Sequence, residues 1–121
     1  MMKKRFIVEF GSGADLHGAD MTKAAARAIK DAVSHACLCG LVEILGRSSF
    51  EGILVHADVR VPDPGKVDVE ALKAMIPIGE KEIVVEKGGM QVPGLEVACF
   101  APGCSDIVMA CAALTVYVDV D

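Results

Sequence analysis

The segment from Gly11 to Gly18 contains the residues whose types and spacing are best suited to chemistry. It reads Gly-Ser-Gly-Ala-Asp-Leu-His-Gly and lies between a predicted strand and the start of a predicted helix. Asp15 and His17 are two positions apart, so both side chains can enter one pocket, His17 as general base or metal ligand and Asp15 as the group that orients it. The structural alternative is a tight turn in which Asp15 binds backbone amides.

Glycines and basic residues in this region favour an anionic ligand. Gly11, Gly13 and Gly18 allow a ligand to approach the backbone closely, and the following helix would offer free N–H groups to an anion. Lys23 and Arg27 belong to the first turns of that helix and add positive charge. The pattern is neither a Walker A loop, since no Gly-Lys-Ser/Thr follows, nor a dinucleotide fingerprint, since a leucine stands where the third glycine belongs.

A second polar group is predicted on the strand Ile53–Val61. Alternation places His56, Asp58 and Arg60 on one face of this strand, opposite its apolar residues. We interpret Arg60 as the ion-pair partner of Asp58 or Asp119. His56 is a candidate for acid–base chemistry, because an imidazole beside carboxylates is easily tuned for that role.

Glu9 is the residue expected to join this second group from another strand. Alternation in residues 5–10 puts Phe6, Val8 and Phe10 on one face and Arg5, Ile7 and Glu9 on the other. If the two strands are neighbours, Glu9 lies within reach of His56 or Asp58. Glu9 is therefore predicted to contribute to ligand binding.

Periodicity and turn residues predict the elements that position these groups. They are a strand at 5–10, a loop at 11–20, a helix capped by Asp20 or Thr22 that runs to about 36, a helical turn at 41–45, strands at 53–61, 82–87 and 107–120, a short helix from Asp68 to about 76, a Gly88-Gly89 turn and an extended arm at 91–100. This order, β-α-β-α-β-β, predicts a single α/β domain over residues 1–121. We expect an α+β two-layer sandwich, a mixed sheet of about four strands with its helices on one face.

The last predicted strand is apolar on both faces, which is typical of strands buried on both sides. Two helices cannot cover both faces of a four-stranded sheet, and a bare apolar face of this size favours aggregation. We therefore expect a homo-oligomer that buries the helix-free face of the sheet.

Composition excludes several classes of protein. Hydrophobic residues make up 53% of the 121 residues, which argues against disorder, and a formal net charge of -5 argues against nucleic-acid binding. We expect no signal peptide, no membrane partner and a cytoplasmic location. Five cysteines cannot all pair internally, so free thiols are expected. Cys111 is interpreted as a small core residue, and Cys99 and Cys104 as flanking a Pro-Gly turn.

The loop segment resembles the GxGxDxHG signature of a small, functionally uncharacterised family of bacterial and plant proteins. All five signature residues are present, as Gly11, Gly13, Asp15, His17 and Gly18. The resemblance extends over essentially the whole chain and implies a shared site rather than a known reaction. More distantly, the layout is similar to one repeat of the ring-opening amidohydrolases and to trimeric chorismate-mutase-like and YjgF-like proteins, whose sites lie between subunits or repeats. That pattern implies a trimer or a multiple of it, although the lysine–serine pairs of the amidohydrolases have no counterpart here.

Two functional hypotheses follow for the same loop. The first is a hydrolase, lyase or isomerase acting on a small anionic or polar metabolite at a subunit junction, with His17, Asp15 and His56 as catalytic residues. Gly11, Gly13, Gly18, Lys23 and Glu9 would then bind the ligand. The second is a non-catalytic ligand-binding or structural homo-oligomer. Asp15, His17 and Asp20 are usable metal ligands, but the sequence assigns neither a metal site nor a cofactor.

Overall fold

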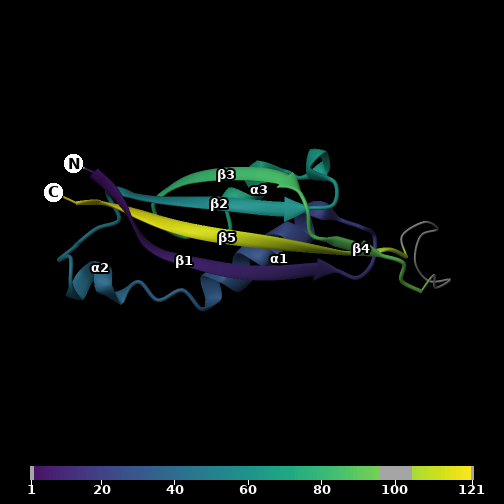
Figure 1. Cartoon of the computed structure of the whole chain (residues 1–121), viewed down its shortest axis with the longest axis horizontal. Coiled ribbons are helices and arrows are strands. Elements are labelled where there is room, and N and C mark those ends of the chain that lie inside the picture. The colour runs from purple at the N-terminus through teal and green to yellow at the C-terminus, as the bar shows by residue number, and fades with distance from the viewer. Residues whose placement is uncertain (1, 96–104, 121) are drawn as a thin grey trace.

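The computed structural model describes residues 2–95 and 105–120, which form one mixed β-sheet with helices packed on it (Figure 1). The described elements are, in order, β1 (Met2–Asp15), α1 (Met21–Ser34), α2 (Cys39–Glu43), β2 (Ile53–Val61), the 3₁₀ turn η1 (Pro64–Lys66), α3 (Val69–Lys73), β3 (Glu80–Lys87), β4 (Met90–Val92) and β5 (Ile107–Val120). The predicted order and fold class are confirmed, with the three-residue β4 as a fifth strand. The predicted Pro102-Gly103 turn, its flanking Cys99 and Cys104, and the end of the 91–100 arm lie outside the described residues.

The sheet has the strand order β1-β5-β2-β3, and β4 also pairs with β5. β5 runs antiparallel to both β1 and β2, whereas β2 and β3 are parallel. The C-terminal strand therefore lies between β1 and β2, which separates the two strands that carry Glu9 and His56. The prediction that Glu9 lies within reach of His56 or Asp58 depended on β1 and β2 being neighbours, and it is wrong.

Local sequence signals fix the ends of the helices. The side chain of Asp20 accepts a hydrogen bond from the Lys23 backbone N–H at 3.0 Å, so Asp20 rather than Thr22 is the cap of α1. Asp68 caps α3 in the same way, accepting from the backbone of Glu70 and Ala71. Both helices begin where the sequence predicts.

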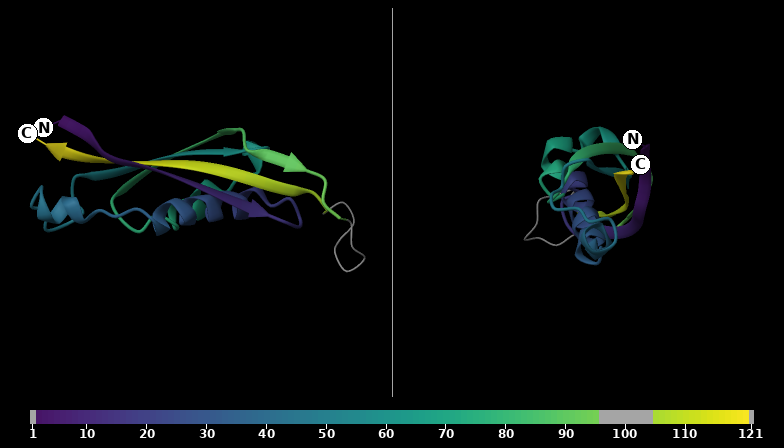
Figure 2. Two further views of the ribbon diagram at one scale, coloured as in Figure 1. Left: turned by 60° about the horizontal axis from the view of Figure 1, so that its bottom comes forward. Right: turned by 90° about the vertical axis from the view of Figure 1, so that its left-hand side faces the viewer.

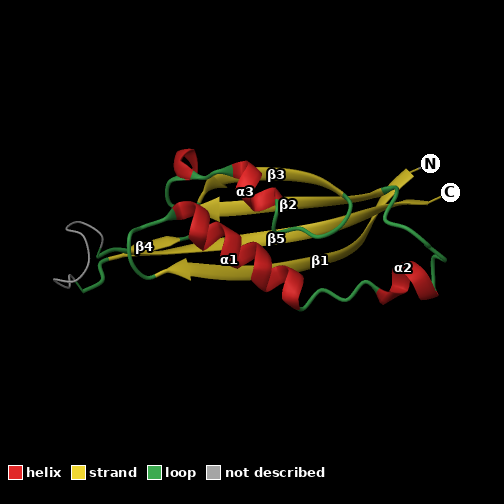
Figure 3. Ribbon diagram, turned by 180° about the vertical axis from the view of Figure 1, so that it is seen from behind, coloured by secondary structure: helices red, strands yellow, loops and turns green. Residues whose placement is uncertain are grey.

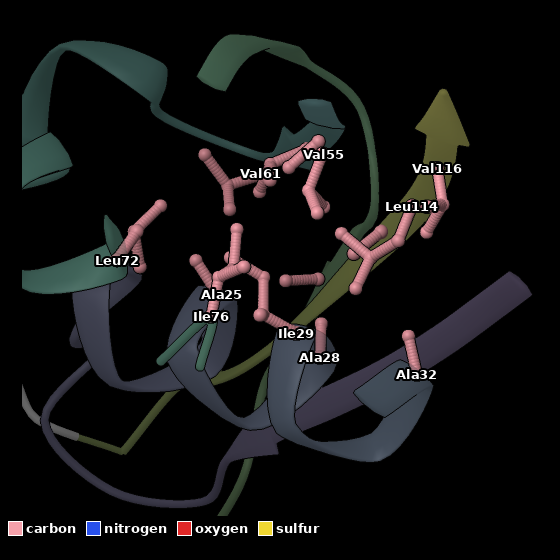
Figure 4. Close-up of a cluster of buried hydrophobic side chains, with 14 of the residues drawn as sticks. Ala25, Ala28, Ile29, Ala32, Val55, Val61, Leu72, Ile76, Leu114 and Val116 are labelled. Carbon is pink, nitrogen blue, oxygen red and sulfur yellow. The ribbon is translucent and has the colours of Figure 1, made fainter. Parts of the chain in front are cut away.

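The core lies between the helices and one face of the sheet (Figure 4). The buried face of α1 is mostly alanine, whereas the facing strands contribute mainly valine. In Figure 3, α1 crosses β5 and β1 while α3 lies over β2 and β3. The predicted apolar face of β2 and the predicted helix-facing side of β5 are both buried, as the alternation indicates.

Gly11 and Gly13 lie in β1, under α1, and not in a loop as predicted. A Cβ atom added to Gly13 would lie 2.5 Å from Arg27 Cβ and 2.6 Å from the Ala24 carbonyl oxygen. One added to Gly11 would lie 2.5 Å from the Ala32 backbone nitrogen. The two glycines therefore let the strand and the alanine face of α1 approach more closely than any side chain would permit.

Both α1 and α3 lie on one face of the sheet, and the described residues place no helix on the other face (Figure 2). Several large apolar side chains are exposed on this helix-free face, among them Phe10, which is 71% exposed, Val8, Met90 and Met109. Cys111 is also exposed there. The prediction that Cys111 is a core residue is wrong, because its position in β5 points away from the helices.

A register shift between Arg5 and Ile7 changes the predicted face of one residue of β1, Phe6. Val8 and Phe10 lie on the helix-free face and Ile7 on the covered face, as the alternation requires. Phe6 departs from this pattern. Its ring packs close to Gly40 of α2, because the bulge changes the phase of the strand at this point.

None of the helices among the described residues has the length and apolar character needed to cross a bilayer.

Candidate functional site

Asp15 is the most buried polar residue of the predicted loop site. It ends β1 with only 3% of its surface exposed. One carboxylate oxygen, Oδ2, accepts a hydrogen bond from the Asp20 backbone N–H at 2.9 Å, and Oδ1 lies 3.9 Å from both Lys23 Nζ and Arg27 Nη1. Asp15 therefore holds the turn before α1 and neutralises part of the nearby positive charge. This contact to a backbone amide is the one that the structural alternative predicts.

The basic residues of this region also have intramolecular partners. Arg27 Nη1 donates to the Ala14 carbonyl oxygen at 2.6 Å and Lys23 Nζ faces Asp15. Gly18 has a φ of +91°, which L side chains rarely adopt, so it makes the turn possible. His17 is exposed on the same turn. Its catalytic role, and anion binding by the glycine backbone, remain predictions.

Glu9 lies on the helix-covered face, opposite His56. Its Oε2 is 3.2 Å from Nδ1 of His35, the residue that ends α1. Glu9 also lines an otherwise apolar cavity of about 270 Å³ between the end of α1 and the 76–78 segment. The cavity is formed by Ile7, Glu9, Val33, Ala36, Leu38, Phe50, Val55, Ile76, Pro77, Ile78, Leu114 and Val116.

His56 lies in a polar hollow on the helix-free face. Its Nδ1 is 3.0 Å from Oε1 of Glu82, the residue that pairs with it in the parallel β2–β3 ladder. The hollow has a volume of about 370 Å³ and is lined by Lys3, Leu54, His56, Glu82 and Tyr117. We call this the His56 hollow. It brings together an imidazole, a carboxylate that can orient it, a phenol and an ammonium group.

Lys3 reaches the His56 hollow from the N-terminal end of β1. Its Nζ lies 3.3 Å from both Asp119 Oδ1 and the Gly52 carbonyl oxygen. Tyr117 comes from β5 and lies opposite Leu54 in the β2–β5 ladder. Four strands therefore contribute to the hollow, which explains why no local motif in the sequence marks it.

Arg60 forms the ion pair with Asp58 that the sequence predicts. Its Nε and Nη2 donate to the two carboxylate oxygens of Asp58 at 2.8 Å and 3.1 Å, and Nη2 also lies 3.2 Å from Glu86. These hydrogen bonds from Arg60 hold the pKa of Asp58 below its ordinary value of 3.8. They also raise the pKa of Arg60. The pair is best explained as a surface ion pair that supports the sheet.

Sequence reasoning missed Glu82 and Lys3 as neighbours of His56. The acid expected there was Glu9, and only the pairing of β2 with β3 identifies Glu82 instead. Alternation alone did place Tyr117 on the same face as His56. Within residues 2–95 and 105–120, no cluster of three or more His, Cys, Asp or Glu side chains could hold a metal ion.

The comparisons with known proteins agree with the resemblance in the sequence. A family model described as conserved hypothetical protein (Lin0512_fam) matches residues 5–116. The chain is also similar to the crystal structure of an FtsZ-like protein of unknown function from Nostoc punctiforme, with 37% identity, a TM-score of 0.87 and 99% of each chain covered. No curated protein matches the chain. The chain therefore belongs to the Lin0512 family of conserved hypothetical proteins.

Proposed function

We propose that the chain binds and transforms a small polar or anionic metabolite in the His56 hollow, with His56 as general base. The observation that carries the proposal is the 3.0 Å contact between His56 Nδ1 and Glu82 Oε1 inside that hollow. A carboxylate that accepts from Nδ1–H fixes the tautomer and leaves Nε2 to take a proton from a ligand.

The chemistry of the hollow favours a ligand with acceptor oxygens. Lys3 and Tyr117 both offer donors, whereas the carboxylate of Glu82 already faces the imidazole. A carboxylate or phosphate on the metabolite would meet these donors, and Leu54 supplies an apolar surface for its carbon atoms. The hydrolase, lyase and isomerase classes all remain compatible with one base beside such a ligand.

We propose further that a second copy of this chain covers the hollow. The hollow is open, and it lies on the same face as the exposed side chains of Val8 and Phe10. On β2 and β3, His56, Asp58 and Arg60 already have ion-pair partners within the chain, so a second copy could cover these three side chains without leaving them unpaired. The resemblance to trimeric proteins leads us to expect three copies or a multiple.

The ligand proposal is tested by NMR of two histidine rings, His56 on the helix-free face and His35 on the helix-covered face. Inorganic phosphate and succinate are titrated into the protein while the imidazole C–H signals are followed by NMR. We expect saturable shifts of the His56 signals, with His35 on the covered face as the internal control. Lys3→Gln should weaken the response several-fold. Shifts of equal size at both rings, or none at His56, would contradict binding in the hollow.

Catalysis is tested separately, by incubating the protein with a mixture of small carboxylic acids and following their loss by mass spectrometry. We expect turnover that His56→Gln abolishes. If His17→Ala abolishes turnover and His56→Gln does not, the 11–18 loop is the catalytic site instead. If the wild-type protein converts none of them although His56 responds to the anions, the chain is a non-catalytic binding protein.

Self-association is tested with two substitutions of similar exposure. Phe10→Asp places a charge on the helix-free face, whereas Ile44→Asp changes an 81% exposed residue of the α2 region. Size-exclusion chromatography with light scattering should give an oligomer for the wild type and for Ile44→Asp. Phe10→Asp should shift the protein towards the monomer, because a charge buried without a partner opposes association. A wild-type monomer at micromolar concentration would refute the assembly.

A further inference from the structure

The apolar cavity that contains Glu9 belongs neither to the 11–18 loop nor to the His56 hollow. It has a volume of about 270 Å³ and lies on the helix-covered face of the sheet. Four of the residues that line it are buried core residues, namely Val55, Ile76, Leu114 and Val116 (Figure 4). Protein interiors are close-packed, so a space among such side chains offers many packing contacts to an apolar molecule.

The cavity can be reached from solvent. Phe50 lines it although 58% of this residue is exposed, and the side chain of Glu9 is 31% exposed. Near the end of α1 the cavity is lined by Val33 and Ala36, whose short side chains leave space that a longer residue would fill. A small molecule can therefore enter the cavity from the surface.

Glu9 gives this cavity its charge. Among the described residues that line it, Glu9 is the one charged residue and the others are apolar. Its Oε2 lies 3.2 Å from Nδ1 of His35, so the other carboxylate oxygen, Oε1, can accept from a second donor. A second carboxylate, that of Asp31, lies 3.9 Å from the other ring nitrogen of His35. Even when His35 is protonated, the two carboxylates exceed its single charge, and the group attracts a cation and repels an anion.

From an apolar cavity with a single carboxylate in its wall, we infer that the chain binds a small primary amine with an apolar body. The ammonium group would donate to Glu9, and the body would lie among the core side chains. An engineered apolar cavity of about 150 Å³ holds benzene, so this cavity has room for a ring of that size and a short aminoalkyl group. The amine site is separate from the His56 hollow, which lies on the other face and offers donors to an anion.

The experiment compares three compounds that share a ring and differ in the charge of the head group. Benzylamine, benzyl alcohol and benzoate are titrated into the intact protein while the imidazole C–H signals of His35 and His56 are followed by NMR. We expect saturable shifts of the His35 signals with benzylamine, at a concentration several-fold lower than with either of the other compounds. His56 is the control on the opposite face and should not respond to benzylamine. Binding of benzyl alcohol or benzoate at His35 as tight as that of benzylamine would overturn the inference.

Two variants separate the role of the charge from the role of the cavity. Glu9→Gln should weaken benzylamine binding several-fold and leave benzyl alcohol binding unchanged, because only the charge is lost. Ala36→Leu should weaken the binding of both compounds, because the longer side chain fills the cavity. Ala26→Leu is the matched control, since Ala26 is also a half-buried alanine but does not line the cavity. It should bind both compounds as the wild type does.

A second copy of the chain is the competing occupant of the cavity. If none of the three compounds moves the His35 signals, and Ala36→Leu changes the oligomeric state measured by light scattering, a side chain of another copy fills the space and the inference is wrong. Unchanged benzylamine binding in both Glu9→Gln and Ala36→Leu would likewise overturn it, because the amine would then bind elsewhere.

Discussion

The two faces of the sheet are built from the same strands but differ in what they require of a side chain. The covered face needs close approach, so it contains glycine in β1 opposite alanine in α1. On the helix-free face, none of the described helices packs closely enough to require small side chains. It presents apolar side chains on β1 and β5 and ion pairs on β2 and β3.

This difference separates residues that fold the chain from residues available for function. Gly11, Gly13 and Asp15 belong to the most distinctive motif of the sequence, yet each has a packing or hydrogen-bonding reason to be where it is. His56 and Glu82 lie on the helix-free face and contact each other, and neither belongs to the hydrophobic core. The comparison predicts that substitutions on the covered face reduce the stability of the protein, whereas those on the helix-free face have little effect on stability.

The largest expected effect is that of Gly13→Ala. The new methyl group would overlap the α1 backbone and Arg27, so the helix must move away from β1. We expect a loss of about 1–3 kcal/mol in the free energy of unfolding, measured by urea denaturation. Gly65→Ala is the control, because the nearest atom to an added Cβ there is 3.7 Å away. Equal stability of the two variants would contradict close packing at β1.

A smaller effect is expected for Asp15→Ala. This change leaves the Asp20 backbone N–H without its acceptor and removes the carboxylate that faces Lys23 and Arg27. The expected loss is about 1 kcal/mol, at the lower end of the cost of an unsatisfied donor, because Asp20 is exposed and water can reach the turn. Asp15→Asn keeps an acceptor oxygen and should lose less. If Asp15→Ala is as stable as the wild type by thermal and urea unfolding, the turn does not depend on this carboxylate.

The smallest effect on stability is expected on the helix-free face, at Asp58. Its pKa is lower in the folded state than its ordinary value of 3.8, so the ion pair with Arg60 stabilises the protein above that pH. This contribution is lost as the pH falls through the lowered folded-state pKa. Because both side chains are more than a third exposed, Asp58→Asn should destabilise by less than about 1 kcal/mol at neutral pH and by nothing in acid.

The pH dependence can be tested by urea unfolding at neutral pH and below pH 3.8, in both the wild-type and the Arg60→Gln backgrounds. With Arg60 replaced, the effect of Asp58→Asn should depend less on pH, because the hydrogen bond from Arg60 is the largest cause of the lowered pKa. An effect of the same size and pH dependence in both backgrounds would show that Arg60 is not the cause.

Much of the fold could be predicted because its signals are local. The caps Asp20 and Asp68, the alanine stripe of the first helix and the alternation in 53–61 and 107–120 depend on residues close in sequence. The end of β1 was misjudged, since glycine was taken as a sign of a loop. The period of two in fact continues from Ile7 through Gly11 and Gly13 to Asp15, and this continuity was the signal available.

The candidate site was less predictable, because it depends on which strands are neighbours. His56 and Tyr117 were assigned to one face by alternation, and that assignment is consistent with the hollow that they line. Glu9 was assigned to the wrong group because β5 inserts between β1 and β2. Lys3 and Glu82 carried no local signal at all.

The sequence by itself determined the elements, their caps, the helix-facing side of each central strand and membership of a family. Those properties depend on backbone preference and hydrophobic periodicity, which act over a few residues. Only the tertiary structure decided that Gly11 and Gly13 lie beneath a helix, that Glu9 meets His35, and that Glu82 meets His56. Contacts of this kind join residues that are far apart in the chain. They depend on which strands pair and in which register, and the hydrophobic pattern of the sequence is compatible with several such pairings.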